Sequence, residues 1–148
     1  MQRFLLIPLL LTIALSDQAF AVEPVYTGGR ERAAIRGFDP VAYFTDHKAV
    51  KGNQAYSFEY QGATWLFSSA TNRDLFAANP SRYTPQYGGY CAYAVSRNTT
   101  ASIKPEYFTI HDGKLYLNYS QSVMKKWIKD KQRYIQEADQ NWPDLVNE

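Results

Sequence analysis

The single cysteine of this sequence, Cys91, carries its most versatile side chain for chemistry. It follows two glycines, Gly88 and Gly89, in the tyrosine-rich segment 83–93. A thiolate can act as a nucleophile or bind a soft metal, whereas an unreactive cysteine behaves as a small buried hydrophobe. Because one cysteine cannot form an internal disulfide, Cys91 is a buried thiol, a metal ligand, a nucleophile or an intermolecular link.

The residues around Cys91 form our candidate ligand site. The glycine pair lets a ligand or a neighbouring strand approach the backbone, and tyrosines offer rigid amphipathic contact area. A tight structural turn is the alternative interpretation of the glycines. We add the expected helix start at 39–43 to this site. The candidate ligand-binding residues are Asp39, Tyr43, Tyr87, Gly88, Gly89, Tyr90 and Tyr93.

A metal site around Cys91 is one hypothesis. A soft ion such as Cu(I) would require a thioether or an imidazole beside the thiolate. We take Cys91, Met124 and His47 as the candidate metal ligands. His111 is a weaker choice because we expect it on the solvent side of a hairpin. No Cys-x-x-Cys spacing supports this site, so inert burial of the thiol stands beside it.

An enzymatic role would need a base to activate Cys91. The chain has two histidines, His47 and His111, and no local motif ties either of them to the cysteine. Sequence signatures of zinc proteases, serine hydrolases and phosphate-binding loops are missing. We therefore expect a binding domain without catalysis, whose partner is a small ligand, a metal ion or another protein.

The N-terminus predicts export. Arg3 precedes an apolar run, 4–15, and Ala19-Phe20-Ala21 fits the small-x-small pattern of a signal peptidase site. We expect a signal peptide at 1–21, an N-terminal arm at 22–36 and one domain at 37–148, located in the periplasm or secreted. A membrane anchor is the alternative for the leader. No later segment has 18 consecutive apolar residues, so we expect no membrane span after cleavage.

The charge balance disfavours nucleic acid as a partner. The formal net charge is +2, and no run of lysine and arginine is dense enough to follow a phosphate backbone.

Turn and cap signals predict an α+β fold. We expect a small antiparallel sheet of two hairpins, with turns at Gln61-Gly62 and Asp112-Gly113, packed with short helices and a C-terminal helical region. Helices should start at three caps, Asp39, Ser69 and Ser120. Asn79-Pro80 should end the second helix, and Trp142-Pro143 should end the last. Residues 22–35 should form a loosely docked arm, with order beginning near Gly37.

The turns also predict strand register. The first hairpin should pair Tyr60 with Ala63, Phe58 with Trp65 and Tyr56 with Phe67, so that aromatic rings share one face. The second should place Phe108, Ile110, Leu115 and Leu117 on a core face, with His111 opposite Lys114 on a solvent-exposed face.

Several segments carry a resemblance to a known family. One part of the chain resembles the YHS domain, a small module found beside heavy-metal transporters and some oxygenase components. The resemblance is carried by Tyr56, Tyr60-Gln61-Gly62, 65–69 and 76–83. Segments 37–44 and 86–93 resemble an exported subgroup of that family. The resemblance covers nearly all of 37–143 and implies the fold expected above.

The chain departs from this family where metal-binding relatives carry ligands. Ser57 replaces the histidine of the Tyr-His-Ser run, and Ser68 and Asn72 replace two cysteines. Neutral hydroxyl and amide groups are poor ligands for soft metals. The resemblance therefore implies that the usual metal site is absent, and that a site for copper or another soft metal would have to be rebuilt around Cys91.

Overall fold

The computed structural model of the chain describes residues 21–147. Apart from its last residue, Ala21, the predicted signal peptide lies outside the described residues.

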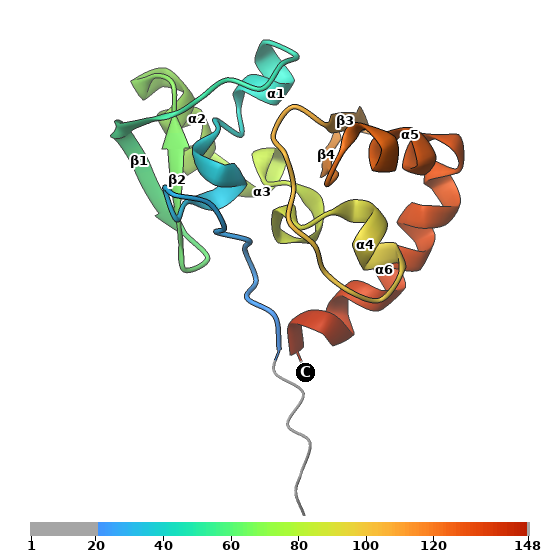
Figure 1. Ribbon diagram of the computed structural model, residues 1–148. Coiled ribbons are helices and arrows are strands. Elements are labelled where there is room, and N and C mark those ends of the chain that lie inside the picture. The colour runs from blue at the N-terminus through green and yellow to red at the C-terminus, as the bar shows by residue number, and fades with distance from the viewer. Residues whose placement is uncertain (1–20, 148) are drawn as a thin grey trace, which may run out of the picture.

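The chain forms two halves, each built around one hairpin (Figure 1). The first half contains α1 (Ala42–Thr45), β1 (Asn53–Tyr60), β2 (Ala63–Phe67), α2 (Ala70–Ala78) and α3 (Pro80–Tyr83). The second contains α4 (Ala92–Ser96), β3 (Phe108–His111), β4 (Lys114–Leu117), α5 (Gln121–Lys129) and α6 (Lys131–Asn147). The α+β prediction is confirmed, although the hairpins form two separate two-stranded sheets and not one.

The first hairpin turns at Gln61-Gly62, as expected. Tyr60 pairs with Ala63 and Phe58 with Trp65, which confirms the register next to the turn. The predicted pairing of Tyr56 with Phe67 is wrong, because the register shifts between Asn53 and Ser57 and Phe67 pairs with Asn53. An irregularity of this kind adds residues to one strand only, so extrapolation from the turn fails beyond it.

A phenylalanine of α2 organises the core of this half. Ser69 caps α2 by accepting a hydrogen bond from the Asn72 backbone N–H at 3.1 Å, and the helix ends before Asn79-Pro80, as predicted. Phe76 is fully buried, with its ring centroid 5.1 Å from that of Trp65 and 5.2 Å from that of Phe67. The short helix α3, which starts at Pro80 itself, was not expected.

The second hairpin has the predicted register and two covered faces. Phe108 pairs with Leu117 and His111 with Lys114. Leu115 and Leu117 join the core of the first half, while Tyr116 joins a second cluster with Trp127, Tyr134 and Ala138. The expectation of a solvent-exposed outer face is wrong, because α5 and α6 pack against it. His111 is consequently only 29% exposed.

The C-terminal region consists of two helices. Ser120 caps α5 by accepting from the Val123 N–H at 3.2 Å, and the chain bends at Asp130 before α6. The prediction that Trp142-Pro143 ends the last helix is wrong, because α6 continues to Asn147 with Pro143 inside it. A proline removes one backbone donor from a helix, but the apolar stripe continues beyond it through Leu145.

The N-terminal arm is packed against the rest of the molecule. Val25 and the segment 33–35 are buried. The Val22 N–H donates to Leu145 O at 3.0 Å, and the Tyr26 N–H donates to Gly88 O at 2.9 Å. The expectation that 22–35 is loosely docked is therefore wrong, because this segment supplies side chains to the core and backbone donors to two distant elements.

Two left-handed turns, η1 (Ala34–Gly37) and η2 (Gln86–Gly89), precede α1 and α4. Each contains three successive residues with positive φ, which are 35–37 in η1 and 87–89 in η2. The same backbone bond closes both turns at 3.0 Å, from Phe38 N–H to Ile35 O and from Tyr90 N–H to Tyr87 O. These turns set the direction in which the chain enters each short helix.

Within residues 21–147, no helix has the length and apolar character needed to cross a bilayer.

Candidate functional site

Asp39 lies at the centre of a closed hydrogen-bond network. Its Oδ1 accepts from the backbone N–H groups of Val41 at 2.8 Å and Ala42 at 3.3 Å. Its Oδ2 accepts from the Ser68 N–H at 2.8 Å, the Ser68 hydroxyl at 2.7 Å and the Asn72 amide at 2.8 Å. The carboxylate is fully buried. It caps the start of α1, as predicted, and joins that helix to α2, which leaves it no free face for a ligand.

Tyr43 is also a core residue. It is fully buried, its hydroxyl donates to Pro105 O at 2.8 Å, and its ring meets Phe108 edge-on at 4.8 Å. Burial raises the pKa of this hydroxyl. Asp39 and Tyr43 therefore join structural elements, and neither contacts the hollow described below.

Cys91 is buried between the second hairpin and α4. Its side chain is 1% exposed, and the thiol donates to Asn118 Oδ1 over 3.5 Å. The same oxygen accepts from the Tyr93 N–H in the first turn of α4. Burial raises the pKa of the Cys91 thiol, so the reactive thiolate is disfavoured. This environment is that of a packed thiol.

The three proposed metal ligands come from different elements, and Cys91 is the buried one. His47 lies on the exposed turn after α1, and Met124 is half-buried on α5. Nowhere in the described part of the chain do three His, Cys, Asp or Glu side chains gather closely enough to hold a metal ion. Ser68 and Asn72 are engaged by Asp39, and Ser57 is exposed on β1. These three positions offer hydroxyl and amide groups, which are poor ligands for a soft metal, so a metal site at Cys91 stays a prediction.

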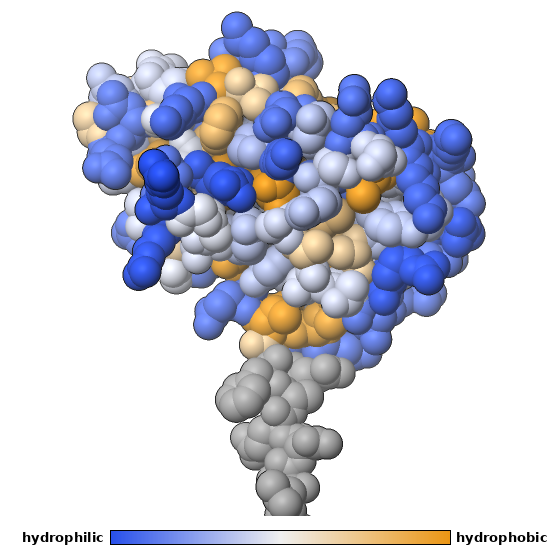
Figure 2. Space-filling view, in the orientation of Figure 1, coloured by the Kyte–Doolittle hydropathy of each residue, from blue (hydrophilic) through white to orange (hydrophobic). Residues whose placement is uncertain are grey.

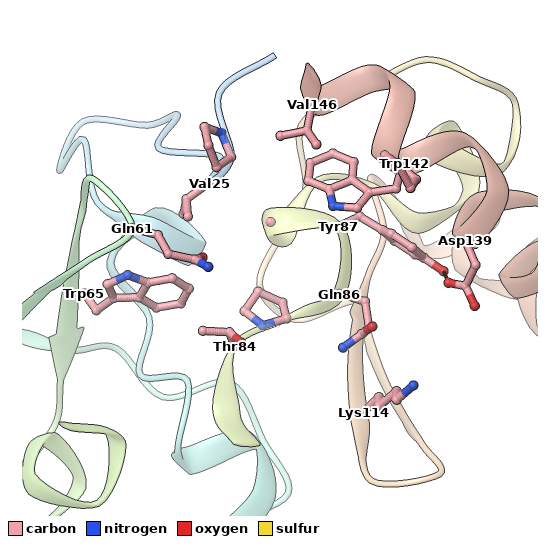
Figure 3. Close-up of a pocket in the computed structure, with 14 residues that line it drawn as sticks. Val25, Gln61, Trp65, Thr84, Gln86, Tyr87, Lys114, Asp139, Trp142 and Val146 are labelled. Atoms are coloured by element: carbon pink, nitrogen blue, oxygen red, sulfur yellow. Dashed lines mark hydrogen bonds between the residues drawn. The ribbon is translucent and has the colours of Figure 1, made fainter. Parts of the chain in front are cut away.

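A groove lies between the two halves, and we call it the α6 groove (Figure 3). Its volume is about 590 Å³. Gln61 and Trp65 of the first hairpin lie on one side, and Trp142 and Val146 of α6 lie on the other, with Thr84 between them. The lining residues are Pro24, Val25, Gln61, Trp65, Thr84, Pro85, Gln86, Tyr87, Gly88, Lys114, Asp139, Trp142, Pro143 and Val146.

Tyr87 links the floor of this groove to α6. Its hydroxyl donates to Asp139 Oδ1 at 2.8 Å, and its ring centroid lies 6.2 Å from that of Trp142. Burial, together with the hydrogen bond to Asp139, raises the pKa of the Tyr87 hydroxyl. Tyr87 has a φ of 58°, a left-handed conformation that is uncommon for a bulky residue and that persists where the surroundings fix it.

Gly88 holds the N-terminal arm against the groove. A side chain at this position would meet Pro24 O at 2.0 Å, because the arm crosses directly above the glycine backbone. Gly88 also has a positive φ of 60°. The close approach that the glycine pair predicted is thus made by the chain's own arm, which forms one end of the groove.

The groove carries both signs of charge. Lys114 extends from the turn of the second hairpin, and Asp139 projects from α6 (Figure 3). Neither side chain forms an ion pair with another described residue. A polar ligand could therefore contact an ammonium group, a carboxylate oxygen and two glutamine amides within one hollow.

The remaining predicted site residues lie outside the groove. Gly89 is buried beneath it, and the Tyr90 ring packs 5.8 Å from Trp142 and 5.3 Å from Tyr26. Tyr93 lies on α4, with the Lys126 ammonium 5.1 Å from its ring centroid. Only Tyr87 and Gly88 of the seven predicted ligand-binding residues line the groove.

Sequence reasoning missed the wall that α6 supplies. The interpretation of Trp142-Pro143 as a helix end removed Trp142 and Val146 from consideration. Ala138, Trp142 and Val146 follow one another at intervals of four residues, and this helical spacing was the available signal that the helix continues past Pro143. Gln61 lies in the turn of the first hairpin and Lys114 begins β4, and neither carries a local sign that it borders the groove.

Comparison with known proteins supports one relationship. The YHS domain model matches residues 41–87. No curated protein and no solved structure shows a significant match to the chain. The match runs from α1 to Tyr87 and includes the first hairpin, whereas Lys114 and the whole of α6 lie beyond it. The similarity to YHS domains thus concerns the first half of the fold and one side of the groove.

Proposed function

We propose that this protein is an exported, non-catalytic binding module with a YHS-like first half, and that its ligand binds in the α6 groove. The observation that carries the proposal is the convergence of Trp65, Trp142 and the polar groups of Lys114, Asp139 and Gln86 around one hollow. Ligand sites typically combine apolar walls with a few polar groups that fix orientation, in volumes of roughly 300–1,000 Å³.

The titratable groups of the groove favour binding over acid–base chemistry. The Tyr87 hydroxyl serves as a donor to Asp139, and its raised pKa keeps it protonated even above the pH at which an ordinary tyrosine ionises. Neither histidine lines this hollow, and the thiol of Cys91 is buried elsewhere. The Tyr87 hydroxyl does pair with the Asp139 carboxylate, but its raised pKa disfavours the phenolate that a nucleophile would need.

Metal handling is the second function that the YHS resemblance suggests, with copper as the first ion to test. It has less support from the residues of this chain. A site at Cys91 would need the buried thiol to lose its contact with Asn118 and to recruit ligands from other elements. The groove, by contrast, needs no rearrangement to admit a ligand.

Export is supported by the Ala19-Phe20-Ala21 pattern and by the position of Val22. Cleavage after Ala21 would leave the new amino group beside Leu145 O, one of the last carbonyls of α6. A cation is favourable at a helix C-terminus. N-terminal sequencing of exported protein should therefore read Val22 first, whereas recovery of intact Met1 protein in membranes would contradict export.

Native mass spectrometry of protein recovered from the exported fraction tests the binding function. We expect an organic adduct that a chelator does not remove. Lys114→Ala should weaken it by about three- to tenfold, the effect of one lost polar contact, and the matched surface control Lys129→Ala should not. A metal adduct that both chelator and Cys91→Ala remove would replace this proposal with metal handling. A bare protein that also fails to bind a metabolite extract would reject both.

A further inference from the structure

A second hollow lies beside the α6 groove. Its volume is about 330 Å³, and it lies between the turn of the second hairpin and the first part of α6. Lys114 lines both hollows, so the two adjoin at this side chain. The lining residues of the second hollow are His111, Asp112, Lys114, Tyr116, Gln132 and Ile135.

One face of α6 forms a wall of both hollows. The α6 residues that line them are Gln132, Ile135, Asp139, Trp142, Pro143 and Val146. Their spacing of three or four residues, with one adjacent pair, keeps them on a single helical stripe. From Gln132 to Val146 the helix rises roughly 21 Å at about 1.5 Å per residue. The two hollows together are therefore long and narrow, with room for about six residues of extended chain at about 3.3 Å each.

We propose that the two hollows together bind an extended polypeptide segment of a partner protein. The inference rests on the proposed function, since it assigns a ligand class to the same groove. A compact small molecule would occupy one hollow only, whereas a chain in extended conformation can contact the full length of α6.

The N-terminal arm shows that one end of the α6 groove accepts polypeptide backbone. Residues 22–26 run between the end of α6 and η2 without forming a helix or strand of their own. Their backbone donates to Leu145 O at 3.0 Å and to Gly88 O at 2.9 Å, and Val25 is 4% exposed. The arm thus combines backbone hydrogen bonds with one buried apolar side chain, which is a recurring mode of peptide recognition.

The polar groups of the groove suit a peptide backbone. Three glutamines, Gln61, Gln86 and Gln132, lie along its length, and each amide can both donate and accept. A peptide bond presents one donor and one acceptor per residue. Trp142 and Val146 make one end of the groove apolar. Figure 2 also shows hydrophobic surface in the part of the molecule where α6 stops. We therefore expect an apolar anchor residue at the end of the bound segment that lies near Trp142.

Selection from a phage-displayed library of random dodecapeptides tests the inference. The full exported chain serves as bait, with Gln132→Ala and Gln140→Ala as matched variants. Both glutamines are exposed on α6, but only Gln132 lines the groove. Selected peptides, once synthesised, should bind wild type and Gln140→Ala within about twofold and Gln132→Ala about three- to tenfold more weakly. They should also shift the NMR signals of the Gln132 side-chain amide and the Trp142 indole.

The outcomes separate this inference from the proposed function. The peptide inference is overturned if Lys114→Ala weakens the adduct, Gln132→Ala does not, and no selected peptide depends on Gln132. That result leaves the binding function intact. A different outcome is that hexasaccharides of glucose or N-acetylglucosamine bind, that this binding requires Gln132, and that no Gln132-dependent peptide is selected. This outcome identifies a glycan site instead. Loss of every groove-dependent ligand overturns both.

Discussion

Asp39 shows how one carboxylate can organise two helices. A helix cap uses one or two acceptor positions, but Asp39 uses both oxygens and accepts from five donors at the start of α1, in the β2–α2 connection and on α2. Ser68 and Asn72 are two of its partners. At the residue scale, these polar groups support the fold directly.

Substitution at Asp39 should therefore be costly. Asp39→Ala leaves buried donors of Ser68 and Asn72 without an acceptor and removes the cap of α1, so we expect a loss of at least about 2 kcal/mol in the free energy of unfolding. Urea denaturation measures this. Asp46→Ala, at an exposed position after α1, should cost less than about 0.5 kcal/mol. Equal effects of the two substitutions would show that the network is not structural.

The thiol of Cys91 should be slow to react. The side chain is 1% exposed and burial raises its pKa, so native protein should react with iodoacetamide far more slowly than protein unfolded in urea. Cys91→Ala provides the unlabelled control. Alkylation of the folded state at a rate close to that of the unfolded chain would revive the nucleophile and metal-ligand interpretations.

At the scale of elements, two glycines with positive φ, one in η2 and one in the turn of the second hairpin, play different roles. Gly88 of η2 supports the N-terminal arm, whereas Gly113 occupies the open turn of the second hairpin. A Cβ at Gly88 would overlap Pro24 O at 2.0 Å, but one at Gly113 would meet no atom within 4 Å. The two glycines share a left-handed conformation and differ in their surroundings.

Alanine substitutions at Gly88 and Gly113 should separate the cost of left-handed backbone strain from the cost of steric overlap. Gly113→Ala carries only the left-handed backbone strain, about 1 kcal/mol, whereas Gly88→Ala should destabilise by clearly more and release the arm. Hydrogen exchange of the Tyr26 amide, which donates to Gly88 O, reports arm docking. Retained protection of that amide in Gly88→Ala would show that the arm does not depend on this contact.

The sequence predicted elements whose signals are local. Gln61-Gly62 and Asp112-Gly113 determined both hairpin turns, and Ser69 and Ser120 marked helix starts, because turn and cap chemistry acts within a few residues. The groove could not be predicted in this way. Its walls come from segments as far apart as Pro24 and Val146, and only tertiary packing brings them together. Tyr87 and Gly88, which the sequence proposed for their unusual local pattern, line the groove, and their role in ligand binding stays a prediction.

At the scale of the whole molecule, buried tyrosines connect stability to alkaline pH. Burial raises the pKa of Tyr116 to about 12, and it raises the pKa values of Tyr43 and Tyr87 further above their usual range. Each hydroxyl stays protonated in the folded chain at a pH where the unfolded chain loses the proton. Their contribution to stability is complete below about pH 10 and is lost progressively as pH rises above it.

The free energy of unfolding should thus fall steeply above about pH 10, by up to about 1.4 kcal/mol per pH unit for each such tyrosine. Denaturation curves at pH 9, 10 and 11 measure the slope. Tyr43→Phe should flatten it, and Tyr119→Phe, at a 51% exposed position, should not. A slope that Tyr43→Phe leaves unchanged would contradict the burial of this hydroxyl.

The indole N–H signals of the three tryptophans in an NMR titration test the central claim most directly. Trp142 and Trp65 line the groove, whereas Trp127 is fully buried and lies outside it. We predict that the ligand released from exported protein, or a selected peptide, shifts the Trp142 signal, with a smaller shift of Trp65 and none of Trp127. Addition of Cu(I) should leave all three signals in place. A ligand that binds without moving Trp142, or stoichiometric Cu(I) binding that Cys91→Ala abolishes, would contradict the assignment of the groove as the functional site.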